Sequence, residues 1–137
     1  MTVTFNSGTL LARVRAAAMQ AVVRGTESVR NEAITLILDT PKTGRVYRRR
    51  GVEHQASAPG EPPASDTGRL VNSIRTEYDQ SNLVGRVVAG SAHAAYLEFG
   101  TQRMEPRPFM RPALRNRGKD IVADIQSSVD RALRGGT

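Results

Sequence analysis

Residues 92–114 read AHAAYLEFGTQRMEPRPFMRPAL, and this stretch decides the fold that the sequence predicts. Tyr96 and Phe99 are three residues apart, so one or two helical turns would place them on one face. Gly100 predicts the end of this short helix. The prolines that follow favour a stiff, extended segment whose one large apolar anchor is Phe109. We therefore expect the stretch to join a long N-terminal helix, a β-hairpin and a C-terminal helix around one small core.

The periodicity on both sides of this stretch predicts those elements. Apolar residues recur at three- and four-residue steps from Leu10, and Pro41 predicts that this helix ends within residues 38–40 after roughly 40 Å. Residues 70–78 alternate as a half-buried strand, and residues 83–89, rich in valine, form the return strand of a hairpin. Pro112 then opens a last helix. The prediction is an α+β fold, with both long helices packed on a small antiparallel sheet. Two strands alone are marginal, so a third should come from the N-terminus, from residues 104–107 or from another subunit.

Residues 41–66 separate the first helix from the hairpin, and we interpret them as a long surface loop within a single domain, 1–137. The segment is poor in apolar residues and rich in Pro, Gly, Ser and Arg. Loops of this length inside a compact domain are uncommon and usually functional. Its basic residues could contact DNA phosphates or an acidic protein surface, or could simply be solvated.

Composition narrows the possible classes of function. Only 39% of the residues are hydrophobic and 4% aromatic, so the core is modest and burial at a subunit interface is expected. The net charge of +7 favours an acidic partner. There is no cysteine and no apolar run long enough to span a membrane, so we expect a soluble protein made in a cytoplasm, without disulfides.

Few residues suggest catalysis, and no cofactor motif is present. His54 and His93 lack a second ligand at helical spacing, so we predict no metal site. Glu98 is either a catalytic base or, as we favour, the partner of Arg103 or Arg107. A hydrolase using Glu98 or His93 would need a pocket that joins the two. Non-specific DNA binding is the better alternative, although aromatic residues do not interleave with the charges.

Several blocks of sequence, in order, resemble the small tail-completion or neck proteins of long-tailed bacteriophages. The blocks are HQASAPGEPP at residues 54–63, DTGRL at 66–70 followed by Ser73-Ile74, AYLEFGT at 95–101 and RPFMRPAL at 107–114. Each block is short, but their order and spacing across nearly the whole chain make the resemblance specific.

The resemblance implies a structural subunit without catalysis or cofactor. Such proteins form a ring, commonly six-fold, between the DNA-filled head and the tail tube, and genomic DNA passes through it. The protein would be assembled in the host bacterial cytoplasm and located in the virion neck, against adaptor, stopper or tail-tube proteins. We expect most arginines on outer or axial faces. The candidate contact residues are Arg45, Arg48, Arg49, Arg50, Pro59, Pro62, Pro63, Tyr96, Glu98, Phe99, Arg107 and Phe109.

Overall fold

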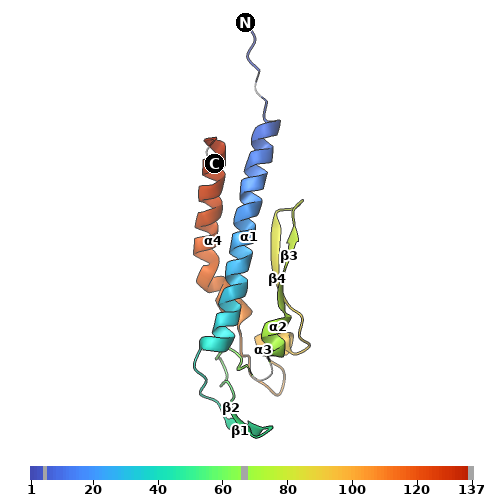
Figure 1. The fold of residues 1–137 in the computed structure, drawn as a ribbon, viewed down its shortest axis with the longest axis vertical. Helices are drawn as coiled ribbons and strands as arrows, with labels where there is room; N and C mark the ends of the chain where they lie inside the picture. The colour runs from blue at the N-terminus through green and yellow to red at the C-terminus, as the bar shows by residue number, and fades with distance from the viewer. Residues whose placement is uncertain (5, 66–67, 136–137) are drawn as a thin grey trace.

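The computed structural model describes residues 1–4, 6–65 and 68–135, and it confirms the α+β fold (Figure 1). In chain order the elements are α1 (Gly8–Asp39), β1 (Val46–Arg49), β2 (Val52–Gln55), α2 (Arg69–Ser73), β3 (Ile74–Asp79), β4 (Val84–Ala89), α3 (Ala94–Phe99) and α4 (Met110–Leu133). Both pairs of strands, β1–β2 and β3–β4, are antiparallel.

Helix α1 is the central element of the molecule (Figure 1). It has 32 residues, which corresponds to about 48 Å, and it ends at Asp39, within the predicted range. Helix α4 runs antiparallel along one side of α1, and the β3–β4 hairpin lies along another (Figure 1). The buried positions of α1, from Ala18 to Ile37, follow the predicted apolar stripe. The two long helices therefore pack on each other, and α1 is the one that contacts the hairpin.

Two glycines let the neighbouring elements approach α1 closely. A Cβ atom on Gly25 of α1 would lie 2.8 Å from Cγ2 of Ile121 in α4. A Cβ atom on Gly85 of β4 would overlap the Thr26 hydroxyl and lie 3.1 Å from Cγ1 of Val22. The absence of a side chain at these two positions sets the spacing of both contacts.

The core lies where α1, the start of β3 and the start of α4 meet. Phe109 and Ile37 are its largest fully enclosed side chains, and they are joined by Val29, Ile74 and Ala113. Phe109 is 1% exposed. The predicted role of Phe109 as the apolar anchor is thus confirmed.

Charged contacts also join the two long helices. Arg24 Nε lies 2.9 Å from Asp124 Oδ2, and Arg117 lies 2.8 Å from Glu32 Oε2. The hydrogen bond from Arg24 lowers the pKa of Asp124, and the hydrogen bond from Asn116 lowers that of Glu32. The Arg24–Asp124 pair is exposed to solvent and is therefore screened, and both pairs lie at the edge of the helix contact. Apolar packing therefore supplies most of the stabilisation between α1 and α4.

The prediction of a strand at residues 70–78 is wrong for the first part of this range. Its first four residues, 70–73, belong to α2, and β3 begins at Ile74. Leu70 and Val71 are adjacent and both pack against the core. Successive strand residues would point to opposite faces, so a helical turn suits this pair better.

Residues 41–66 also contain more structure than predicted. Strands β1 and β2 form a hairpin in this segment, joined by Arg50 and Gly51 with φ of 54° and 78°. Such angles at both central residues are typical of a type I′ turn, which usually contains Asn-Gly. The Arg50-Gly51 pair predicts such a turn less strongly than Asn-Gly would.

The expected third strand is absent from the described residues. The β3–β4 sheet has two strands, and the Thr101–Met104 bridge is isolated from it. Among the residues that the structure describes, none pairs as a strand with either outer edge of the β3–β4 hairpin. An unpaired edge presents backbone N–H and C=O groups that a further strand can bind.

Candidate interaction surfaces

Glu98 connects the two halves of the stretch at residues 92–114. It lies in α3, its side chain is buried, and its Oε2 accepts hydrogen bonds from the backbone N–H groups of Phe109 at 2.8 Å and Met110 at 3.0 Å. Oε1 accepts a third from the N–H of Arg111 at 2.9 Å. The first N–H groups of a helix lack partners within it, and the helix dipole favours a negative charge there. Glu98 therefore caps the N-terminus of α4.

This contact corrects three interpretations of Glu98: arginine partner, catalytic base and contact for another protein. No described ion pair joins it to Arg103 or Arg107, so the favoured interpretation as an arginine partner is wrong. Both carboxylate oxygens already accept backbone hydrogen bonds, and the buried side chain is not free to act as a base or as a contact for another protein. Its function in the structure is to hold α3 against the start of α4.

The backbone strengthens this connection. The N–H of Arg107 donates to Leu97 O at 2.6 Å, and the N–H of Gly100 donates to Tyr96 O at 2.8 Å. Gly100 has a φ of 76°, and a Cβ atom there would lie 2.8 Å from Met104 O. The end of α3 predicted at Gly100 is confirmed.

The aromatic contact candidates of this stretch differ in exposure. Tyr96 is 54% and Phe99 is 61% exposed, and Arg111 lies over the Phe99 ring, with its guanidinium carbon 4.6 Å from the ring centre. Both side chains are accessible to another molecule. Phe109 is enclosed in the core, so its assignment as a partner contact is wrong.

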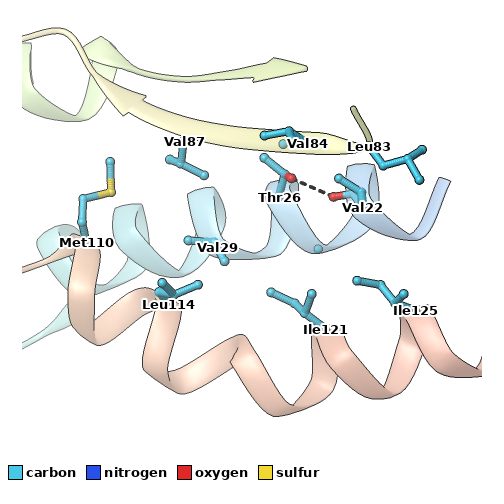
Figure 2. A pocket seen from close by; sticks show the side chains of 12 residues that line it. Val22, Thr26, Val29, Leu83, Val84, Val87, Met110, Leu114, Ile121 and Ile125 are labelled. Atoms are coloured by element: carbon cyan, nitrogen blue, oxygen red, sulfur yellow. Dashed lines mark hydrogen bonds between the residues drawn. The ribbon is translucent and has the colours of Figure 1, made fainter. Parts of the chain in front are cut away.

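An open apolar groove runs along α1 between the β3–β4 hairpin and α4 (Figure 2). Its volume is about 490 Å³. The side chains that line it come from all three elements and are Val22, Thr26, Val29, Leu83, Val84, Val87, Met110, Leu114, Ile121 and Ile125. Thr26 donates its hydroxyl to Val22 O at 2.7 Å, so this polar group is already satisfied. Leu114 is 58% exposed at the groove.

The sequence predicted the apolar residues of α4 but not this groove. Leu114, Ile121 and Ile125 belong to the stripe that periodicity assigns to the core. The structure covers that stripe only in part, because α4 contacts α1 and leaves one flank facing the hairpin across the groove (Figure 2). The groove is thus an apolar surface that this chain leaves open.

The β1–β2 hairpin projects from the end of the molecule opposite the two termini (Figure 1). Arg48, Arg49 and Arg50 are exposed on it, and Arg45, the residue before β1, is exposed as well. The segment leading to the hairpin is held by the Glu61 carboxylate, which accepts hydrogen bonds from Ala58 N at 2.8 Å and from the N–H and hydroxyl of Thr43. The Thr43 hydroxyl is the main cause of the lowered pKa of Glu61. The hairpin is an ordered basic projection with a fixed base.

The three prolines after the hairpin lie in different environments. Pro59 is exposed and Pro62 is half-buried, so both have accessible surface. Pro63 is buried within the chain, so little of its surface is available to a partner.

The two histidines belong to different parts of the fold. His54 in β2 stacks on Tyr47 of β1, with the ring centres 5.6 Å apart, and His93 precedes α3. Among the described residues there is no cluster of His, Asp and Glu that could hold a metal ion. In the same part of the chain, no helix is long and apolar enough to cross a membrane.

Comparison with family models, with curated proteins and with solved structures finds no match for this chain. The resemblance to phage neck proteins consequently stays a prediction from the sequence.

Proposed function

We propose that the chain is a structural subunit of a ring at the neck of a long-tailed bacteriophage, where it joins the DNA-filled head to the tail tube without catalysis. The observation that supports this most directly is the open apolar groove over α1. Beside it lies a two-stranded hairpin whose outer edges have no partner strand in the described residues. Both features are what a subunit completed by neighbouring copies would leave open.

The geometry of a ring explains why the surfaces differ from one another. Each contact in a cyclic ring joins two different faces of identical subunits. The groove provides a concave apolar face, and a neighbouring copy would supply the convex one. Six-fold symmetry is the expectation that the resemblance carries, and the groove itself is compatible with any cyclic number.

The basic hairpin supports a second contact in this assembly. If its arginines faced the channel they would bind the passing DNA and slow it. We therefore place the hairpin on an outer or axial face, docked on an acidic ring of an adaptor, stopper or tail-tube protein. Its position at one end of the long molecule suits an axial contact (Figure 1).

Charge reversal tests this placement. Replacing Arg48, Arg49 and Arg50 with Glu should block the joining of heads to tails, while the protein stays folded because these side chains are exposed. The matched control carries the same charge change on the two long helices, at exposed residues without a described contact: Arg13→Glu, Arg115→Glu and Lys119→Glu. Equal joining by both triple variants would show that the hairpin is not the docking element. Images of the intact particle with this chain traced in it test the ring itself.

Non-specific DNA binding is the second candidate, and the exposed arginines of the hairpin are the observation that favours it. A gel-shift series with random duplex DNA separates the two functions. Tight binding that weakens steeply as salt rises would favour the DNA-binding protein. Weak binding at physiological salt would favour the ring subunit.

A further inference from the structure

The outer edge of β4 borders the open groove over α1 (Figure 2). The groove residues that the hairpin supplies belong to β4 or directly precede it, and none comes from β3. Strand β3 instead contacts another flank of α1, where the hydroxyl groups of Thr76 and Tyr78 donate to Glu27 at 3.0 Å and 2.7 Å. A chain added beside β4 would therefore lie in the groove, between this strand and α4.

The hydrogen bonds of the β3–β4 ladder show which backbone groups face this edge. Gly90 N–H donates to Ser73 O at 3.0 Å, whereas the N–H and C=O of the next residue, Ile74, bond outside the ladder. Bonded and unbonded pairs alternate in an antiparallel ladder, so the register directs the N–H and C=O groups of Gly85 and Val87 away from β3. No described hydrogen bond uses these outward groups.

Such a groove suits an extended segment. A strand beside β4 would use the free N–H and C=O groups of the edge and turn alternate side chains onto the apolar surface of α1. A helix or a small apolar molecule could fill the groove, but it would bury these backbone groups without partners, which is unfavourable.

Residues 1–4, Met-Thr-Val-Thr, have the composition of such a strand. Three of them are β-branched, and none is proline, glycine or charged. Met1 and Val3 are 119% and 89% exposed, and a strand would turn both to one face. The other long segments between elements, 40–45, 56–65 and 100–109, each contain proline and glycine, which disfavour a strand.

This segment does not reach the groove of its own chain. Gly85 of β4 lies against Thr26, which is about 27 Å along α1 from Gly8. The chain from Val3 to Gly8 spans at most about 18 Å when it is fully extended. Only a second copy can therefore place residues 1–4 beside β4.

We propose that residues 1–4 of a neighbouring copy add a third strand to β4, in the groove over α1. The inference rests on the proposed assembly of copies and names the segment that joins them. Each copy gives its segment at one face and receives another in its groove. These are the two different faces that a ring needs.

Cross-linking tests the proposal, since the chain has no cysteine of its own. Particles are assembled with Val3→Cys/Val87→Cys chains and treated with a short bismaleimide. The control pair is Val3→Cys/Val122→Cys, because Val122 is exposed on α4 and does not line the groove. We expect at least about tenfold more linkage between chains with Val87→Cys, because facing and diagonal residues of adjacent strands lie only about 5–8 Å apart.

The possible results separate this proposal from the proposed ring. Equal linkage by the two pairs, or linkage of Val87→Cys to a different virion protein, would overturn the exchanged strand. Linkage within one chain, which mass spectrometry identifies as a monomer carrying the linker, would overturn it too. A ring seen in images without linkage would remove the exchanged strand and leave the ring standing. Particles whose neck lacks this chain would contradict the proposed function and this inference together.

Proline variants test the backbone pairing. Successive residues of a strand direct their N–H groups to opposite edges, so Val3→Pro/Thr4→Pro removes one donor that would face β4. Both residues are exposed and have no described contact, so the fold is retained. We expect about tenfold lower ring occupancy than with Val3→Ala/Thr4→Ala, which corresponds to the loss of about one hydrogen bond. Equal occupancy with the two variants would overturn the proposal.

Discussion

The carboxylate of Glu98 accepts hydrogen bonds from the backbone N–H groups of residues 109–111 and so joins α3 to the start of α4. Glu98→Gln keeps the size of the side chain but removes its charge and one acceptor oxygen. Hydrogen bonds to a charged group stabilise by about 1.5–3 kcal/mol, so we expect the free energy of unfolding to fall by about 1–3 kcal/mol. Urea unfolding followed by circular dichroism measures it.

Glu105→Gln is the matched control for Glu98→Gln, because Glu105 is exposed and has no described contact. It should change the free energy of unfolding by less than about 0.5 kcal/mol. If both variants unfold at the same urea concentration, the cap does not stabilise α4.

At the residue scale, the sequence correctly predicted that Phe109 is an apolar anchor, but it did not predict the contacts of Glu98. Large apolar side chains such as Phe are usually buried, so the burial of Phe109 follows from its residue type. The hydrogen bonds of Glu98 reach 11–13 residues along the chain, and no helical or strand spacing reports such a contact. One signal was available: Phe109 stands at the N-cap of α4, where Ser, Thr, Asp or Asn would usually satisfy the first N–H groups. A helix start without its own cap requires an acceptor from elsewhere.

At the scale of the elements, the contact between β4 and α1 depends on Gly85. A methyl group there would overlap the Thr26 hydroxyl and crowd Val22, and moving Thr26 would break its hydrogen bond to Val22 O. We expect Gly85→Ala to lower the free energy of unfolding by about 1–3 kcal/mol. Thermal and urea unfolding both measure this loss.

Gly118→Ala provides the control, since Gly118 lies within α4 and a Cβ atom there would meet nothing within 4 Å. Alanine is the better helix former, so this variant should be more stable by about 0.5–1 kcal/mol. Opposite signs at the two glycines are the expected result. A Gly85→Ala variant as stable as the native chain would mean that the hairpin moves freely relative to α1.

Elements with a buried face were predicted from the sequence, and those without one were not. Helix α1 and the first four residues of β3 show the periodicity that a half-buried element needs. The β1–β2 hairpin buries almost nothing: Val46 and Val52 are 55% and 57% exposed. Backbone pairing, the turn at Arg50 and Gly51 and the stack of Tyr47 on His54 hold it together, and none of these produces a hydrophobic pattern.

At the scale of the whole molecule, the groove is a property of the arrangement rather than of any segment. Its walls come from α1, β4 and α4, and each wall taken alone appears as an ordinary buried stripe in the sequence. The sequence predicted that surface would be left for a neighbour, from the low aromatic content and the unfinished sheet. It could not locate that surface, because the spacing of three elements depends on Gly25, Gly85 and the packing around them.

The last prediction concerns the groove as a contact between copies. Leu114 lines the groove yet is 58% exposed, so Leu114→Glu should change the free energy of unfolding by less than about 1 kcal/mol. In the ring the same carboxylate would be buried against an apolar neighbour without a partner, which is strongly unfavourable. Particles assembled with this variant should therefore lack the ring in images, although the purified protein stays folded.

Val122→Glu is the control, because Val122 is on the same helix, is 56% exposed and does not line the groove. It places an equal charge on α4 at equal exposure, so both variants alter solubility and net charge alike. A difference between them in ring assembly can then come only from the groove. Rings present at normal occupancy with Leu114→Glu would mean that the groove is not the subunit contact. A stable dimer of the isolated chain would count against a ring of any kind. A closed two-fold pair uses one face of each copy, whereas a ring needs two.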